Sequence, residues 1–257
     1  MAEYTLITGA SSGIGECFAR ALAARKHNLV LVARSQAKLE SLAGELRTAH
    51  QIQTEPVALD LSVPGAAARL AQLVTERKLA IDLLINNAGF GAPGEFWRIS
   101  FDREAEMVRL NVQALMELTH LLLPAMVERR RGGIINVSST ASFQPMPYSA
   151  VYAATKAFVT TFSLGLAEEV RPYGLRVVTL CPGVTATNFF VAGGYGTRRA
   201  PGGFQAPEEV VSAALKALDH KGGLVVPRLL NKFGVFIQRF VPRSAVLRVT
   251  ARMFRRR

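Results

Sequence analysis

A tyrosine and a lysine one helical turn apart give this chain its clearest prospect of acid–base chemistry. Tyr152 and Lys156 lie in the run SAVYAATKAFVTTFSLGLAEEV, which is rich in alanine and ends near Pro172 and Gly174, so it predicts a helix. Residues four apart share a helix face, which would bring the phenol and the ammonium together. A nearby cation favours phenolate and would lower the tyrosine pKa towards a range useful for proton transfer. The alternative is an ordinary exposed pair on a helix surface.

A glycine-rich turn follows the first predicted strand. Residues 4–8 are strand-like, and residues 9–15 (GASSGIG) lead into a helical pattern that runs to Lys26. Glycines let backbone N–H groups approach a pyrophosphate closely, and a helix N-terminus adds partial positive charge. The spacing G-x-x-x-G-x-G differs from the commoner G-x-G-x-x-G, and a simple tight turn is the alternative. The order strand, turn and helix favours a nucleotide-binding loop.

The second predicted strand, residues 28–33, is followed by a base where many dinucleotide sites have an acid. An Asp or Glu near this point often holds the ribose 2′-hydroxyl of NAD. Here the chain has Arg34, with Lys38 one turn later. A guanidinium fork matches a 2′-phosphate, which an acid would repel, although Arg34 could also be a solvated side chain. We therefore expect NADP(H) as the cofactor.

Polar and small residues follow the later predicted strands, at the edge where open α/β sheets bind ligands. Asp60 ends the strand 54–60, and its carboxylate could accept a hydrogen bond from an adenine amino group or cap a helix that begins near Pro64. The strands 81–85, 133–137 and 175–180 are followed by Asn86-Asn87-Ala88-Gly89, Ser138-Ser139 and Cys181-Pro182-Gly183.

The elements that must position these residues alternate along the chain. Strands and helical patterns with short connections predict one α/β domain, a doubly wound, Rossmann-like parallel sheet with helices on both faces. We place this domain at residues 1–227, with a helix at 208–218 and a last strand at 224–226. The longest helical pattern, residues 101–130, contains Asn111, a poor helix former that predicts a local opening of the backbone.

One stretch has no periodicity. Residues 188–205 combine glycines with aromatic side chains, which predicts a mobile lid over a site, with a simple surface loop as the alternative.

The net charge of +12 is concentrated at the C-terminal end. Residues 221–257 hold ten Lys and Arg and no acid, so the rest of the chain carries 12 − 10 = +2. The charge is therefore no sign of nucleic-acid binding by the domain. Residues 228–257 place apolar and basic residues at helical spacing on both sides of Pro242, which predicts an extension of two amphipathic helices. These could lie on an anionic membrane, or pack over the pocket or a subunit interface with a solvated basic face.

The positions of the cysteines and histidines indicate the redox compartment and whether the chain has a metal site. Cys17 and Cys181 are far apart and form no CxxC motif, which fits a reducing compartment, and the four histidines show no metal-ligand spacing. The sequence begins without a visible secretory signal and has no uninterrupted apolar run of 18 residues. We expect no metal site and a cytoplasmic location, peripheral to a membrane if the extension binds one.

Taken together, these motifs resemble the short-chain dehydrogenase/reductase family in its single-domain branch. The match covers residues 3–227. It rests on TGASSGIG at 8–15, Asp60, NNAG at 86–89, Asn111, Ser139, YAATK at 152–156 and PG at 182–183, in the family's order and with thirteen residues from Ser139 to Tyr152.

The resemblance implies roles for four catalytic residues. Tyr152 would give its proton to the substrate oxygen, and Lys156 would lower the tyrosine pKa and hold the nicotinamide ribose. Ser139 would hydrogen-bond the substrate carbonyl, a role for which its neighbour Ser138 lies one residue too far from Tyr152. Asn111 would keep a helix kink and a water for a proton relay to Lys156.

The resemblance also implies the residues that hold the cofactor. Thr187 would hold the nicotinamide carboxamide, and Thr185 stands where the family usually has Ile or Val. The full set of expected cofactor contacts is Gly9, Ser11, Ser12, Gly13, Ile14, Gly15, Arg34, Lys38, Asp60, Leu61, Asn87, Ala88, Gly89, Tyr152, Lys156, Pro182, Gly183, Thr185 and Thr187.

The expected function is NADPH-dependent reduction of a ketone or aldehyde to an alcohol. Aromatic residues such as Phe189, Tyr195 and Phe204 favour a hydrophobic carbonyl, for example a 3-oxoacyl or steroid-like ketone. The alternative is a non-catalytic NADP-binding regulator or scaffold, which would not need all four catalytic residues. A nucleic-acid binder would lack any recognition module behind its basic residues. The resemblance implies a homodimer or homotetramer through the helices that carry Asn111 and Tyr152.

Overall fold

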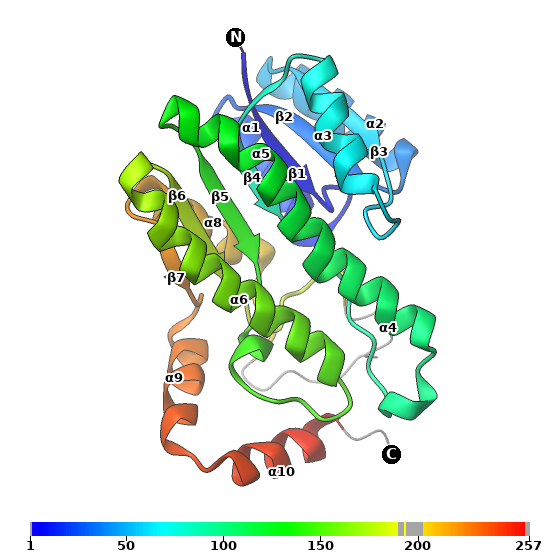
Figure 1. Ribbon diagram of the computed structural model, residues 1–257, viewed down its shortest axis with the longest axis vertical. Coiled ribbons are helices and arrows are strands. Elements are labelled where there is room, and N and C mark those ends of the chain that lie inside the picture. The colour runs from blue at the N-terminus through cyan, green and yellow to red at the C-terminus, as the bar shows by residue number, and fades with distance from the viewer. Residues whose placement is uncertain (1, 190–192, 194–202, 255–257) are drawn as a thin grey trace.

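A parallel β-sheet forms the centre of the molecule (Figure 1). The computed structural model describes residues 2–189, 193 and 203–254. Within them lies a seven-stranded sheet of order β3-β2-β1-β4-β5-β6-β7, with every neighbouring pair parallel. The strands are β1 (Glu3–Thr8), β2 (Asn28–Ala33), β3 (Thr54–Ala58), β4 (Ala80–Asn86), β5 (Gly133–Val137), β6 (Arg176–Leu180) and β7 (Gly223–Val225). The order reverses between β1 and β4, the point at which such sheets bind ligands.

Helices cover both faces of this sheet, so the predicted doubly wound architecture is confirmed. One core lies between the sheet and α1 (Gly13–Ala24), α2 (Gln36–His50) and α8 (Pro207–Asp219). The other lies between the sheet and α3 (Ala66–Glu76), α5 (Leu115–Arg129) and α6 (Ala150–Val170). Strand side chains such as Ile7, Leu31 and Leu84 have no exposed area. Each such side chain stabilises the fold by about 1.5–3 kcal/mol through burial, because a parallel sheet is covered on both faces.

The long helical pattern at 101–130 is divided as its asparagine predicted. It begins as α4 (Phe101–Val108), widens into a π-helical turn, η2 (Arg109–Ala114), and continues as α5. Short 3₁₀ turns lie at η1 (Phe96–Arg98), η3 (Thr140–Phe143) and η4 (Arg171–Tyr173).

Two helical runs, Phe101–Arg129 and Ala150–Tyr173, are long and apolar enough to cross a membrane by length and composition. Glu117 and Lys156 interrupt their apolar residues. Leu118 and Leu166 place part of each run in the core beside the sheet, which is how helices of a packed α/β domain pass the same test.

The C-terminal extension forms the two helical segments that the sequence predicts. After β7 the chain enters α9 (Leu229–Ile237), the turn η5 (Gln238–Phe240) and, after Pro242, α10 (Arg243–Phe254). In Figure 1 these elements, orange to red, leave the sheet and extend beyond its end.

Candidate active site

The predicted site residues gather where the strands end. Because β1, β4, β5 and β6 are parallel neighbours, the segments that follow them meet at one edge of the sheet. The ends of β5 and β6 are tied directly, since the Ser138 N–H donates to the Leu180 carbonyl at 2.7 Å and the Thr140 N–H donates to the Pro182 carbonyl at 2.9 Å. Ser139 is thereby held beside the predicted cofactor segment at Pro182.

The glycine loop is packed so tightly that two positions require glycine. A Cβ on Gly15 would lie 2.2 Å from the Gly9 carbonyl oxygen and 2.5 Å from the Asn87 side chain, and Gly9 itself has a φ of +68°. Asn87 Nδ2 donates to the Thr8 carbonyl at 2.9 Å, which locks the loop to the end of β4. This packing holds the loop in a fixed turn at the α1 N-terminus, the end of a helix that favours phosphate.

The segment after β6 lies against the same loop. A Cβ on Gly13 would meet Thr187 Cγ2 at 3.0 Å, so the segment predicted to hold the pyrophosphate lies against the segment predicted to hold the nicotinamide. The Thr187 hydroxyl accepts a hydrogen bond from the Phe189 N–H at 3.3 Å. Thr185 is buried, donates to the Gly183 carbonyl at 3.0 Å and pairs with Gln205, so its side chain stabilises the segment itself.

Thr8 is a positioning residue that sequence reasoning missed. Its hydroxyl oxygen accepts hydrogen bonds from the N–H groups of Asn87 at 2.9 Å and Ala88 at 3.0 Å, and the hydroxyl donates to the Ile85 carbonyl at 3.3 Å. One side chain at the end of β1 therefore fixes the turn after β4. The available signal was its place as the first residue of TGASSGIG, directly before the glycine loop.

Asp60 does not cap the following helix, so that alternative is wrong. Its Oδ1 accepts hydrogen bonds from the Ser62 N–H at 2.9 Å and the Ser62 hydroxyl at 2.7 Å, which forms a local turn. The helix itself, α3, begins at Ala66, and its N-cap is Gly65. The turn fixes the carboxylate at the strand end, beside the buried Leu61.

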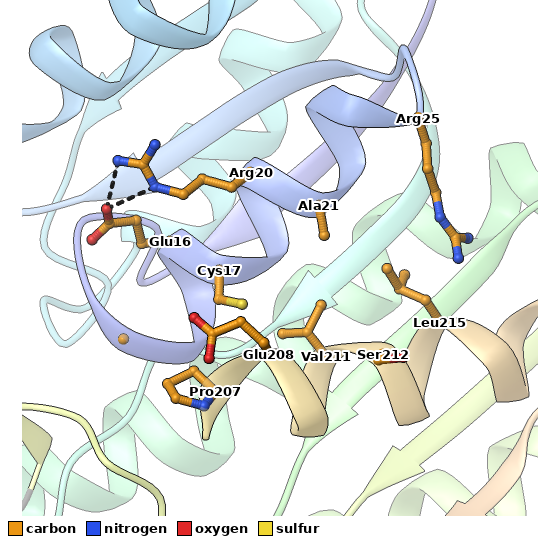
Figure 2. Close-up of a pocket in the computed structure, with 11 residues that line it drawn as sticks. Glu16, Cys17, Arg20, Ala21, Arg25, Pro207, Glu208, Val211, Ser212 and Leu215 are labelled. Carbon is orange, nitrogen blue, oxygen red and sulfur yellow. Dashed lines mark hydrogen bonds and ion pairs between the residues drawn. The ribbon is translucent and has the colours of Figure 1, made fainter. Parts of the chain in front are cut away.

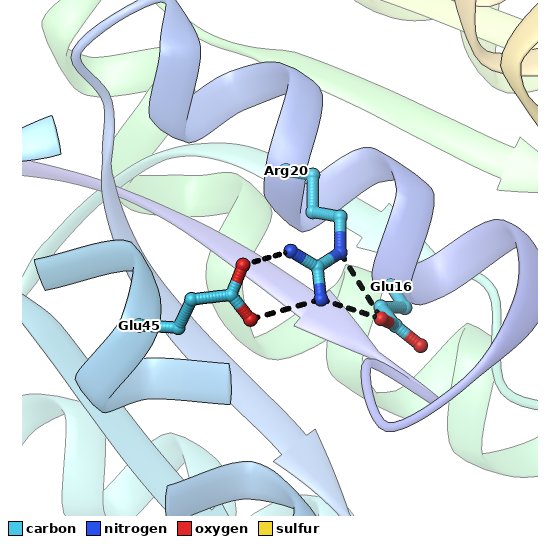
Figure 3. Close-up of polar contacts among 3 residues, drawn as sticks. All are labelled: Glu16, Arg20 and Glu45. Atoms are coloured by element: carbon cyan, nitrogen blue, oxygen red, sulfur yellow. Dashed lines mark hydrogen bonds and ion pairs between the residues drawn. The ribbon is translucent and has the colours of Figure 1, made fainter. Parts of the chain in front are cut away.

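Basic side chains on α1, after β2 and on α2 differ in what they contact. Arg20 on α1 is engaged by Glu16, at 3.0 Å from its Nε, and by Glu45 of α2, as Figure 3 shows. Arg34 and Lys38 are exposed and form no ion pair with any residue that the structure describes. These two cations at the end of β2 are the ones available to an anionic ligand.

Tyr152 and Lys156 are buried, so the alternative of an exposed pair is wrong. They keep only 9% and 5% of their surface exposed. Lys156 Nζ donates to the Val137 carbonyl at 2.8 Å. It also lies close to Gly89, where a Cβ would be 3.5 Å from Nζ and 2.9 Å from Asn111 Oδ1. The lysine, the asparagine and the turn after β4 thus converge.

Asn111 connects the π-helical turn to the tyrosine helix. Its Nδ2 donates to the Phe90 carbonyl at 2.9 Å and to Thr155 Oγ1 at 3.1 Å, and its Oδ1 accepts from the Phe90 N–H at 3.1 Å. Thr155 in turn donates to the Tyr152 carbonyl at 2.7 Å. Thr155 was not predicted, although it stands between Tyr152 and Lys156 in the same motif.

Burial in a site without carboxylates lowers the pKa of Lys156 to about 8. The nearby Cys181 acts in the opposite direction, but weakly, because burial raises the pKa of that thiol and keeps it neutral. At neutral pH the ammonium is therefore still charged, and it loses its proton just above the physiological range.

Ser139 and Ser138 make different hydrogen bonds and therefore have different roles. Ser139 is the N-cap of η3 and accepts a hydrogen bond from the Ala141 N–H at 3.1 Å. Ser138 is buried, donates to the Lys156 carbonyl at 2.8 Å and shares a hydrogen bond of 2.7 Å with Thr160. Ser138 therefore stabilises the helix of Lys156, which agrees with the choice of Ser139 as the substrate contact.

An apolar wall surrounds the tyrosine. Tyr152 belongs to a cluster with Met107, Ala141 and Met146, and its ring centroid lies 5.7 Å from that of Phe189. The predicted lid, 188–205, continues from Phe189, but residues 190–192 and 194–202, including Phe190 and Tyr195, lie outside the described residues.

A groove of about 590 Å³ lies between α1 and α8 and reaches Gly13 of the glycine loop (Figure 2). Its charged lining residues are Glu16, Glu208, Arg20 and Arg25, and both arginines are already paired with carboxylates, so the lining favours a phosphate little. Cys17, also in this groove, has its pKa raised to about 11, mainly by burial. The groove is therefore a poor site for a nucleotide or a reactive thiol. Both cysteines are free, and the described residues contain no group of metal-ligating side chains.

Comparison with known proteins decides the family. A family model described as short chain dehydrogenase matches residues 3–193. The chain belongs to this family. The resemblance in its motifs is thereby confirmed.

Named relatives of this short-chain dehydrogenase include a hydroxysteroid dehydrogenase-like protein and 3-oxoacyl-CoA reductases. Hydroxysteroid dehydrogenase-like protein 1 of Gallus gallus is 33% identical over 218 residues, 84% of this chain and 65% of the relative. The very-long-chain 3-oxoacyl-CoA reductase of Mus musculus is 34% identical over 191 residues, 73% of this chain and 61% of the relative. The chain thus spans less than two thirds of these relatives' length.

Solved structures of the family superpose over nearly the whole chain. A short-chain dehydrogenase from Sphingobium yanoikuyae in complex with NADPH has a TM-score of 0.84 and 32% identity, covering 96% of this chain and 94% of that one. A 7β-hydroxysteroid dehydrogenase has a TM-score of 0.86 and 27% identity, covering 97% and 96%.

The lowered pKa of Lys156 predicts how this short-chain dehydrogenase responds to pH. If the charged ammonium holds the cofactor ribose, kcat/KM for NADPH should fall above pH about 8, by about tenfold per pH unit at the limit. Steady-state kinetics between pH 6.5 and 10 at saturating carbonyl measure this, with Lys156→Met as the control expected to show no such inflection. A wild-type profile that stays flat to pH 9.5 would contradict the assignment.

Proposed function

We propose that the chain reduces a hydrophobic ketone or aldehyde to an alcohol with NADPH. The observation that carries the proposal is the convergence of Tyr152, Lys156, Asn111 and Ser139 at the sheet edge that also bears the glycine loop. The loop supports a dinucleotide site, because the close packing of Gly9 and Gly15 holds its turn at the α1 N-terminus, where a helix end favours phosphate.

The proposed chemistry divides among the four side chains. When bound, NADPH supplies a hydride to the carbonyl carbon. Tyr152 donates its phenolic proton to the carbonyl oxygen as negative charge develops there, while Ser139 hydrogen-bonds the same oxygen. Lys156 stabilises the resulting phenolate with its ammonium and holds the nicotinamide ribose. Asn111 and its π-helical turn keep the tyrosine helix in place and open a path for protons from solvent towards Lys156.

The preference for NADPH rests on the end of β2. Arg34 and Lys38 are exposed there, and neither forms an ion pair with a described residue, so both can contact a 2′-phosphate. Solved relatives include complexes with NADPH and with NAD, so this preference is argued from the two side chains of this chain.

The preference for a hydrophobic substrate rests on the wall around Tyr152. Met107 and Met146 pack with Tyr152 in an apolar cluster, Phe189 lies beside its ring, and none of these side chains is charged. The relatives' names, very-long-chain 3-oxoacyl-CoA reductase and hydroxysteroid dehydrogenase-like protein, favour a 3-oxoacyl thioester or a steroid-like ketone.

We also propose that the chain forms a homodimer or homotetramer and works in the cytoplasm. An apolar groove of about 560 Å³ runs along the outer face of α6, lined by residues that include Phe158, Phe162 and Leu166. This face suits a second copy, as expected for the helices that carry Asn111 and Tyr152. The free thiols of Cys17 and Cys181 fit a reducing compartment.

Oxidation of NADPH, followed by absorbance against a panel of carbonyls, tests the proposed function. The panel holds 3-oxoacyl thioesters of increasing chain length, steroid ketones and small polar aldehydes. We expect turnover to rise with the apolar size of the carbonyl and to be slower with NADH. Tight NADPH binding without turnover of any member would favour the alternative, a non-catalytic NADP-binding regulator.

A further inference from the structure

The C-terminal extension exposes large apolar side chains that a packed helix would bury. Leu229 is 82% exposed, Phe233 is 61% exposed, and no residue of α9 is buried. We call this set the tail surface. Its members are Leu229, Leu230, Phe233, Phe236, Ile237, Phe240, Val241, Leu247 and Val249.

The apolar residues of α9 and η5 form one stripe. Residues 229, 233, 236 and 240 follow each other at intervals of three and four, and the flanking residues 230 and 237 are seven apart, which places them on one side of a helix. In a surface helix such a stripe normally faces the core. Here it faces solvent, and the rings of Phe236 and Phe240 pack against each other with centroids 5.2 Å apart.

Positive charge accompanies this stripe. The elements α9, η5 and α10 carry five basic residues, Lys232, Arg239, Arg243, Arg248 and Arg252. Residues 220–257 contain no Asp or Glu. Among the described residues after Gly222, the one ion pair to an acid joins Arg228 to Glu209 of α8, at 3.4 Å. The five basic side chains named above can therefore contact an external anion.

The extension is anchored beside the active site. Asn231 of α9 lies against Gly183, where a Cβ would be 2.5 Å from Asn231 Nδ2, and the same amide donates to the Pro227 carbonyl at 3.0 Å. The helix also contacts η3, the turn that follows Ser139. One side of α9 therefore contacts the catalytic edge of the sheet, while its apolar stripe is turned away.

We propose that the tail surface docks on an anionic phospholipid membrane. Its Phe, Leu and Ile side chains enter the boundary between headgroups and acyl chains, and its Lys and Arg side chains contact the phosphates. A second copy of the chain is a poor occupant, because a two-fold contact would set this basic surface against itself with no acid from residues 220–257 to pair with it.

Docking of this kind would present the active site to molecules dissolved in the membrane. That consequence rests on the proposed reduction of a hydrophobic carbonyl, because α9 joins the tail surface to the segments at Ser139 and Gly183. Docking itself requires no turnover, so vesicle binding can be measured even if the proposed reaction were wrong.

Flotation of the full-length chain with vesicles tests the proposal. We expect binding to vesicles of phosphatidylcholine with phosphatidylglycerol, weak binding to phosphatidylcholine alone, and release as NaCl rises from about 0.1 M to about 0.5 M, because salt screens the charges. Phe233→Asp should lower the partition coefficient at least about tenfold through lost insertion, and Lys232→Glu about tenfold through reversed charge.

Two matched variants control for a general loss of apolar surface or charge. Val63, which is 56% exposed on the loop after β3, and Arg69, exposed on α3, lie outside the extension. Val63→Asp and Arg69→Glu should leave flotation unchanged, and far-ultraviolet circular dichroism should show that all four variants fold. Equal binding to neutral and anionic vesicles, or unchanged flotation of Phe233→Asp, would overturn the proposal. So would dissociation of a wild-type oligomer by Phe233→Asp with no effect on vesicles, since a second copy would then cover the surface.

Discussion

Replacing Tyr152 with phenylalanine should lower kcat/KM for the carbonyl by about 10²- to 10⁴-fold, the range that a positioned general acid contributes. The substitution removes one oxygen atom from a ring that packs beside Phe189 and Met107, so the apolar wall is kept. The affinity for NADPH should stay close to that of the wild type, because Lys156 and the glycine loop are untouched. Stopped-flow hydride transfer and fluorescence titration with NADPH measure the two quantities separately.

The matched control for this variant is Tyr173→Phe. Tyr173 lies in η4, at the far end of the tyrosine helix, and is exposed. Its loss should leave kcat/KM unchanged. If Tyr152→Phe kept more than about a tenth of the wild-type kcat/KM, the proton would have to come from another group, since such a small loss is below the range for general acid catalysis.

Replacing Arg34 with aspartate should weaken NADPH binding by about 100-fold or more and change NADH binding little. The substitution removes charge-assisted hydrogen bonds, each worth about 1.5–3 kcal/mol, and sets a carboxylate against the 2′-phosphate. NADH carries a hydroxyl at that position, and the carboxylate of an aspartate can accept a hydrogen bond from it. Dissociation constants for both cofactors, measured by titration at fixed ionic strength, give the result.

A second arginine separates this local effect from the general field of the protein. Arg69 is exposed on α3 and is not among the residues predicted to hold the cofactor. Arg69→Asp should change both dissociation constants little. Equal weakening of NADPH and NADH by Arg34→Asp would rule out a role that depends on the 2′-phosphate.

The strands and the motifs could be predicted because their signals are local. Apolar runs bounded by glycine, asparagine or serine mark the buried strands and the ends at which ligands bind. Asn111 is the sharpest example, since a polar residue that disfavours helix predicted an opening of the backbone and the structure has a π-helical turn at that residue.

The contacts that position those motifs could not be predicted, because they depend on which strands become neighbours. Thr8 orients the turn after β4 only because β1 and β4 are paired. Thr155 serves Asn111 only because the π-helical turn packs against α6. The suggested helix cap at Asp60 was wrong for a local reason. Pro64 suggested that the helix begins near that residue, whereas Gly65, in a left-handed conformation, is the N-cap of α3.

The C-terminal extension shows the same limit for a larger element. Helical spacing predicted α9 and α10 and the break at Pro242. Periodicity predicts that a helix has an apolar face, but it does not predict what that face contacts. In α9 the apolar face is turned to solvent.

The buried ammonium of Lys156 has a further consequence, for the folding equilibrium. The pKa is about 8 in the native protein and 10.5 in an exposed lysine, so between these values the unfolded chain binds more protons than the native one. The contribution of this group to the free energy of unfolding therefore rises with pH across that window, by about 3 kcal/mol in all. Below pH 8 the native chain carries the full penalty of a desolvated charge. The charge that the proposed catalysis requires is thus one that opposes folding, and the contribution of Lys156 to stability is greatest at a pH where the expected activity is low.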